Sequence, residues 1–120
     1  MFEQHKVFGV EQTRHELIVV PYGDAAGFRD MDVENELNAV LDEIERSDQQ
    51  PLLIDFENSD YFGTVIIGAA VRLAQAVAAK GCRTAVCNLS EQMQQVLQVM
   101  KIETLLPSFP SRRKAQKSLR

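Results

Sequence analysis

The sequence predicts an α/β domain, and two patterns of apolar residues support that prediction. Residues Leu52 to Phe56 form a short apolar run that leads, after a polar segment, into a helix-like pattern beginning at Thr64. A run that is apolar at nearly every position is typical of a strand covered on both faces. A further strand-like run, Arg83 to Asn88, follows the helix, so strand, helix and strand fall within about forty residues, the length expected of a crossover between parallel strands.

The N-terminal third predicts a hairpin and then a helix. Val7 to Glu11 and Leu17 to Pro21 are strand-like runs joined by the polar residues 12–16, which is the pattern of a β-hairpin. After a glycine-containing loop, residues 22–30, apolar side chains recur at helical spacing. Ser47 to Pro51 ends that helix. The apolar positions of the helix are Val33, Leu37, Val40, Leu41 and Ile44.

A second helix is expected over residues 64–80. Gly81 stands where a glycine in the left-handed conformation commonly ends a helix. One stripe of apolar and small residues runs along the helix and indicates the face that is buried. It comprises Ile67, Ala70, Val71, Ala74, Val77 and Ala78.

The C-terminal third predicts two more helices around a short edge strand. Ser90 is expected to cap a helix whose Met93, Val96, Leu97 and Met100 are interpreted as core residues rather than as a cofactor site. Residues 105–110 contain two prolines, which restricts them to an edge strand. Ser111 is expected to cap a short tail helix, with Ala115 and Leu119 facing inward.

Length and composition indicate one cytoplasmic domain over residues 1–120. The chain is 45% hydrophobic and 25% charged, which suits a soluble domain with a single core. The N-terminus lacks an apolar run of signal-peptide length, and the most apolar stretch, residues 65–71, meets Arg72 after seven residues. No membrane segment is therefore expected.

The net charge of −4 hides an asymmetry along the chain. The last nine residues carry +5 and the remainder carries −9. Basic tails can contact nucleic acids or membranes. The favoured interpretation is instead the solvated face of the tail helix, without direct contact to nucleic acid or membrane. The residues concerned are Arg112, Arg113, Lys114, Lys117 and Arg120.

The two cysteines, Cys82 and Cys87, are expected to be buried thiols. On one strand they would lie roughly 16 Å apart, beyond the reach of a disulfide. His5 and His15 lie at the other end of the chain, so no metal centre is expected.

No enzyme motif is present. The chain has no G-x-S-x-G elbow, no phosphate-binding loop of the Walker type and no H-E-x-x-H. Asp55, Glu57 and Asp60 cluster near the central loop, but no histidine is local, and exposed strand-end carboxylates are a better interpretation than an acid–base pair. Gly63 alone precedes the helix, so a nucleotide phosphate would find no extended nest. We therefore expect neither catalysis nor a cofactor.

Thr64 is the residue with the most informative position. A hydroxyl at the start of a helix accepts hydrogen bonds from the first-turn N–H groups. A phosphate added to that hydroxyl would meet the positive end of the helix dipole. The sequence leaves two roles open for Thr64, a helix cap and a regulatory switch.

From about residue 7 to 118 the chain resembles the STAS domain family of anti-sigma factor antagonists. Residues Leu53 to Thr64 follow the family's pattern of a strand ending in Asp, an aromatic or aliphatic pair, then Asp-Ser and a helix. Here Gly63 occupies the position of the usual Asp, and Thr64 that of the phosphorylatable Ser. The other similar segments are Gly23-Asp24, Ala79 to Ser90 and Val96 to Leu106.

The resemblance implies a mixed sheet of four to five strands with about four helices packed against it. It also implies binding to an anti-sigma factor that is a serine-threonine kinase-like ATPase, ended by phosphorylation of Thr64. A non-phosphorylated scaffold or oligomerisation module, for example a homodimer, is the alternative. The implied partner-binding residues are Gly23, Asp24, Asp60, Tyr61, Phe62, Gly63, Thr64 and Val65.

Overall fold

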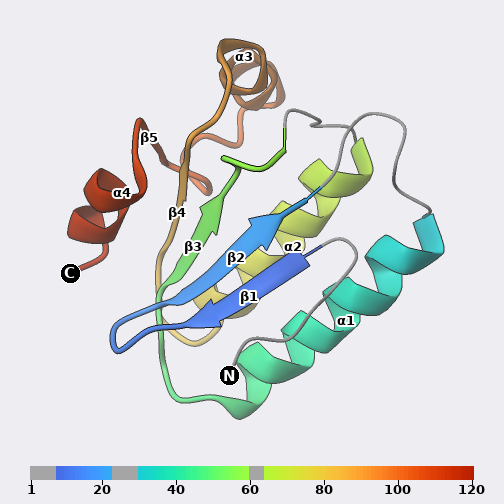
Figure 1. Ribbon diagram of the computed structural model, residues 1–120, viewed down its shortest axis with the longest axis vertical. Coiled ribbons are helices and arrows are strands. Elements are labelled where there is room, and N and C mark those ends of the chain that lie inside the picture. The colour runs from blue at the N-terminus through green and yellow to red at the C-terminus, as the bar shows by residue number, and fades with distance from the viewer. Residues whose placement is uncertain (1–7, 23–29, 60–63) are drawn as a thin grey trace.

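The computed structural model describes residues 8–22, 30–59 and 64–120, with the backbone alone at 30–32 and 64. Within these ranges the chain forms five strands and four helices around one sheet (Figure 1). Their order is β1 (Phe8–Gln12), β2 (Leu17–Pro21), α1 (Asp30–Arg46), β3 (Leu52–Asp55), α2 (Thr64–Ala78), β4 (Thr84–Cys87), α3 (Glu91–Met100), β5 (Ser108–Phe109) and α4 (Arg112–Ser118).

The sheet is mixed, as predicted. The strands lie in the order β1-β2-β3-β4-β5, with β1 antiparallel to β2 and every later pair parallel. The four parallel strands therefore end at one edge of the sheet. We call it the carboxyl edge, and define it by the last strand residues Pro21, Asp55, Cys87 and Phe109.

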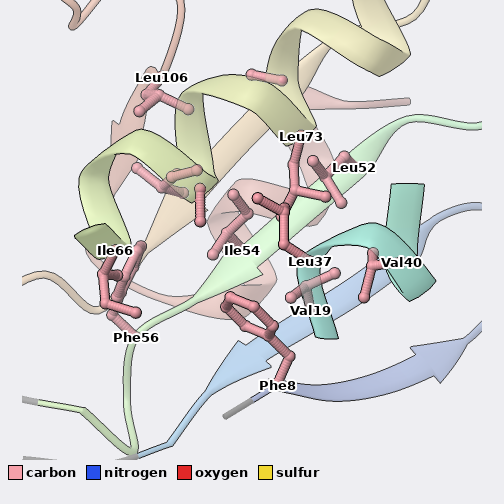
Figure 2. Packing of buried hydrophobic residues seen from close by; sticks show 14 of the residues in the cluster. Phe8, Val19, Leu37, Val40, Leu52, Ile54, Phe56, Ile66, Leu73 and Leu106 are labelled. Carbon is pink, nitrogen blue, oxygen red and sulfur yellow. The ribbon is translucent and has the colours of Figure 1, made fainter. Parts of the chain in front are cut away.

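α1 and α2 cover one face of the sheet (Figure 1). Right-handed crossovers from β2 to β3 and from β3 to β4 put both helices on the same side, because the strand order advances in one direction. Side chains from both helices meet alternate residues of the strands, such as Val19 and Ile54, and form the main core (Figure 2). None of the helices within the described residues is long and apolar enough to cross a membrane.

α4 packs on the opposite face. The residues of β2 alternate: Leu17 and Val19 join the main core, whereas Ile18 and Val20 join a second cluster with Ala115 of α4. Ala115 is buried and Leu119 packs against this cluster, as their spacing predicted. The sheet is thus covered on both faces, which explains its nearly continuous apolar strands.

The predicted helix caps are confirmed. The hydroxyl oxygens of Ser90 and Ser111 accept from the backbone N–H groups of Met93 and Lys114, each at 3.2 Å. Gly81 is left-handed with φ +79°, and the N–H groups of Gly81 and Cys82 donate to the carbonyl oxygens of Ala78 and Val77. This pair of bonds is the Schellman motif, in which glycine is favoured because it has no Cβ to clash.

One core prediction was wrong. Met93 and Leu97 of α3 are buried, but Met100 is 47% exposed and Val99, one residue earlier, is 81% exposed. α3 ends at Met100, and its C-cap, Lys101, is left-handed with φ +59°. The buried residues of α3 are therefore Met93 and Leu97, with Val96 half-buried.

Lys80 closes the end of α1. Its ammonium Nζ donates to the carbonyl oxygens of Ile44, Glu45 and Ser47, each at 2.7 Å. These carbonyls lie at the C-terminus of α1, where helical partners are missing and the dipole is negative. A cation there is favourable both as a hydrogen-bond donor and as a charge.

Replacing Lys80 by methionine should lower the free energy of unfolding by about 1 to 3 kcal/mol, because it leaves these carbonyls without a charged donor. Chemical denaturation measures the change. Lys117→Met removes an exposed ammonium from α4 and is the matched control. Equal losses in the two variants would show that Lys80 does not act as a cap.

Candidate binding site at the carboxyl edge of the sheet

Several surface elements meet at the carboxyl edge. The turn after β3, the first turn of α2 and the segment between β4 and α3 all lie at this end of the molecule (Figure 1). In open α/β sheets, ligands bind beyond the carboxyl ends of the strands. The carboxyl edge is therefore the first place to look for function.

The start of α2 is where the sequence placed it. Thr64 is the first residue of the helix, and Val65, the next residue, is 36% exposed. Among the partner-binding residues implied by the family resemblance, Gly23, Asp24, Asp60, Tyr61, Phe62 and Gly63 lie outside the described residues. Tyr22 and Ser59, the last described residues before these segments, follow the neighbouring strands β2 and β3.

Asp55, the last residue of β3, is the most unusual side chain at this edge. It is fully buried, with 0% of its surface exposed, on the face covered by α4. Its Oδ1 accepts from the backbone N–H of Glu57 at 3.0 Å and from the amide Nδ2 of Asn88 at 2.9 Å. Its Oδ2 accepts from Nε of Arg112 at 2.8 Å. The carboxylate thus holds the chain where it leaves both β3 and β4.

Arg112, the first residue of α4, connects this carboxylate to a second one. Its Nη1 donates to Oε2 of Glu11 on β1 at 3.2 Å. The guanidinium therefore spans β2 and joins the strands on either side of it. Such a planar group can serve two carboxylates at once, which a lysine ammonium does less well.

Two predictions from the sequence need correction here. Asp55 was expected to be an exposed strand-end carboxylate and is instead buried and paired, whereas Glu57 is exposed. Arg112 was expected on the solvated face of the tail helix, yet it is only 34% exposed and bound to Asp55 and Glu11. The other four basic residues of the tail are exposed, as predicted. The signal in the sequence was Asp55 itself: a single Asp in an otherwise apolar strand indicates a buried carboxylate that needs a polar or charged partner.

The electrostatics of the cluster favour an ionised Asp55. Burial alone would raise the pKa of this carboxyl, but the hydrogen bonds from Asn88, Arg112 and the Glu57 N–H hold the pKa below its ordinary value. Burial and the nearby Asp55 charge raise the pKa of the Cys87 thiol to about 12. Cys87 is therefore a protonated, buried thiol and unsuited to nucleophilic attack. Both cysteines are free thiols, as predicted, but Cys82 is only half-buried.

Asn88 completes the arrangement. It follows β4 directly and is left-handed, with φ +59°, a conformation that asparagine tolerates better than most residues. This conformation accompanies the bond from its amide to Asp55. Two residues later Ser90 caps α3, the helix that lies beyond the carboxyl edge (Figure 1) and whose Val99 and Met100 are exposed.

A groove of about 350 Å³ lies between α1 and α2, away from this cluster. It is mostly apolar, and the ammonium of Lys80 on its rim is already bound to three carbonyls. Nowhere in the described ranges do three or more His, Cys, Asp or Glu side chains gather as metal ligands would. The groove is lined by Leu41, Ile44, Glu45, Ala76, Ala79 and Lys80.

The fold defines the class first: a small α/β module whose mixed sheet presents a helix N-terminus and exposed apolar side chains at its carboxyl edge. The STAS domain family matches residues 26–115, three quarters of the chain, and the chain belongs to this family. No curated protein sequence matches significantly.

Solved structures confirm the fold. A putative anti-sigma factor antagonist from Thermotoga maritima superimposes with a TM-score of 0.77 at 12% identity, covering 93% of each chain. The anti-sigma factor antagonist SpoIIAA in its unphosphorylated form gives 0.75 at 17% identity, covering 93% of this chain and 95% of that one. Its phosphorylated form, described as a Bacillus cell fate determinant, gives 0.72 at 18% identity over 95% and 100%. The chain is thus a STAS domain that resembles anti-sigma factor antagonists in fold.

Proposed function

We propose that this protein is a regulatory binding module that captures an anti-sigma factor of the kinase-like ATPase type through its carboxyl edge. The observation that carries the proposal is the start of α2 at Thr64, beside the exposed Val65, in a member of the STAS family. Solved relatives of this fold include both an unphosphorylated and a phosphorylated anti-sigma factor antagonist. The proposed interface comprises the eight partner-binding residues named from the sequence.

Phosphorylation of Thr64 is the proposed switch. A phosphate adds about −1.5 to −2 charges and three acceptor oxygens. At the N-terminus of α2 the helix dipole favours that charge, and the first turn of α2 contains no acidic residue to repel it. The domain should therefore stay folded while its binding surface gains negative charge. A partner docked on Val65 would then meet an added charge in the interface.

The switch predicts different effects for two substitutions of Thr64. Thr64→Ala should retain binding, whereas Thr64→Asp should weaken it by about 1 to 3 kcal/mol, the scale of a misplaced interfacial charge. Wild type and both variants serve as baits for proteins of the native lysate, and titration calorimetry with the captured partner then gives the affinities. Gln49→Asp, which adds the same charge on an exposed residue just before β3, at the opposite edge, is the control. Equal affinity of the alanine and aspartate variants would remove the switch.

Mass spectrometry of the captured proteins and of the Thr64 peptide tests the rest of the proposal. An ATP-binding, kinase-like protein held by wild type and lost by Thr64→Asp supports it. Residues 1–120 would then act as one cytoplasmic domain, by binding rather than by catalysis, without a cofactor and without direct contact to nucleic acid or membrane. Capture of the same proteins by wild type and by Thr64→Asp, with no phosphate on Thr64 of the wild type, contradicts it.

A scaffold or oligomerisation module is the second candidate. The observation that favours it is the exposure of Val99 and Met100 on α3, since adjacent exposed apolar side chains mark many contact surfaces. Such a module would show a molar mass that rises with concentration in light scattering. The mass would not respond to Thr64→Asp but would fall in Val99→Gln.

A further inference from the structure

The C-terminal helix is linked to the proposed binding edge through one side chain. Arg112 opens α4, and its Nε lies 2.8 Å from Oδ2 of the buried Asp55. Asp55 is the last residue of β3, and α2 begins nine positions later at Thr64. A residue at the far end of the chain therefore contacts the strand that leads into the proposed switch.

The Asp55 carboxylate determines how the chain leaves β3. Its Oδ1 accepts from the N–H of Glu57, two residues further on, which is the hydrogen bond of an Asx turn. The N–H of Ser59 then donates to the carbonyl oxygen of Phe56 at 3.1 Å and tightens the same turn. Residues 56–59 are the described segment that leads directly towards residues 60–63.

Arg112 is the only charged partner of Asp55 among the described residues. Without the guanidinium, a fully buried carboxylate would face only the neutral donors of Glu57 and Asn88. A buried charge left without its cation draws in water or takes up a proton, and either change weakens its hold on those donors. The turn would then lose its fixed geometry.

We propose that Arg112 is a positioning residue: acting through Asp55, it holds the turn 56–59 in the geometry that partner binding at the carboxyl edge requires. The binding half of this inference rests on the proposed function, and the geometric half does not. Through Arg112, the C-terminal helix α4 thus supports the binding surface, although it lies on the face of the sheet opposite to α2.

The structure allows Arg112 to be changed without releasing α4. Ala115 is buried in the second cluster, and the amide Nε2 of Gln116 donates at 2.7 Å to Oε1 of Glu16, itself fully buried at the start of β2. These contacts are independent of Arg112. Arg112→Gln should therefore fold with α4 in place, while Asp55 loses its cation.

The test compares Arg112→Gln with Arg112→Lys, which keeps the charge, and with Arg113→Gln. Arg113 is exposed on the same helix, and no ion pair joins it to any described residue. Amide hydrogen exchange, followed residue by residue by NMR, reports the turn at Glu57 and Ser59 and the remote helix at Val40. Each amide exchange rate is corrected for the contribution of global unfolding, which is measured in denaturant.

In Arg112→Gln, protection of the Glu57 and Ser59 amides should fall by about tenfold more than that of Val40, because only the turn loses its anchor. Arg112→Lys should recover part of the protection, and Arg113→Gln should match wild type. A uniform loss at all three amides would make the ion pair merely structural and overturn the inference. This result does not depend on any partner.

The part of the inference that concerns partner binding is tested by the affinity of each variant for the partner that the wild-type bait captures. The affinity should fall about tenfold in Arg112→Gln and remain unchanged in Arg113→Gln, since misplacing an interfacial segment costs on this scale. Altered exchange with unchanged affinity would overturn the inference. If the baits show that the proposed function fails, the exchange rates alone still decide whether Arg112 positions the turn.

Discussion

Asp55→Ala should lower the free energy of unfolding by about 3 to 5 kcal/mol, the cost of removing one member of a buried ion pair. The loss exceeds that of an ordinary hydrogen bond because three donors lose their acceptor at once. They are the backbone N–H of Glu57, the amide of Asn88 and Nε of Arg112. Of a total stability of about 5 to 15 kcal/mol for a domain of this kind, such a loss is a large share. Denaturant unfolding at low temperature measures it.

Glu57→Ala is the matched control for this prediction. Glu57 is an exposed carboxylate two residues further along the same turn, so its replacement should change stability by no more than about 0.5 kcal/mol. Similar losses in Asp55→Ala and Glu57→Ala would mean that the buried cluster contributes little.

The pH dependence gives a second check on the same side chain. The folded pKa of Asp55 lies below its ordinary value of 3.8, so the unfolded state binds the proton first as the pH falls. The contribution of Asp55 is therefore fully present above that value and is lost as the pH falls through the folded pKa. In Asp55→Asn the decline of stability with acidification below about pH 4 should be shallower than in wild type. Glu11, the other carboxylate that Arg112 contacts, is unchanged in this variant. An unchanged slope would contradict a depressed pKa.

Most of the fold was predictable because local patterns and global packing agree. Runs such as Leu52 to Ile54 are apolar at each position because helices cover the sheet on both faces. A continuous apolar run is the pattern expected of a strand that is buried on both faces. The glycine at position 81 and the serines at 90 and 111 mark helix ends through local backbone chemistry. Such signals act within a few residues and can be recognised without a structure.

The polar cluster was not predictable for the opposite reason. Asp55 and Arg112 are separated by 57 positions and Arg112 and Glu11 by 101, so no local pattern relates them. The tail helix was placed correctly, but its amphipathic pattern does not reveal which cation turns inward at its first residue. The exposure of Met100 was missed because its helical spacing from Met93 and Leu97 indicates a buried position. The partner-binding function of Thr64 stays a prediction.

Phe56→Ala is expected to be as damaging as the loss of Asp55, and it tests the support beneath the proposed switch. Phe56 follows β3 directly and is buried in the main core, in the same cluster as Ile66 of the first turn of α2 (Figure 2). Truncation removes the ring and leaves a cavity, at a cost of about 3 to 5 kcal/mol. Because Ile66, Ala69 and Ala70 of α2 belong to the same cluster as Phe56, amide exchange over residues 66–70 should accelerate beyond the global change.

Ile44→Ala provides the comparison. Ile44 is also buried, but it lies in the last turn of α1, and its truncation costs about 2 to 5 kcal/mol. Both variants should be destabilised, but only Phe56→Ala should also lose affinity for the captured partner after correction for the folded fraction. Phe56→Leu, which refills most of the cavity, should recover both properties in part. Equal affinity losses in Phe56→Ala and Ile44→Ala would show that the partner responds to overall stability and not to the start of α2. The same comparison separates a core that merely holds the fold together from one that sets the geometry of the carboxyl edge.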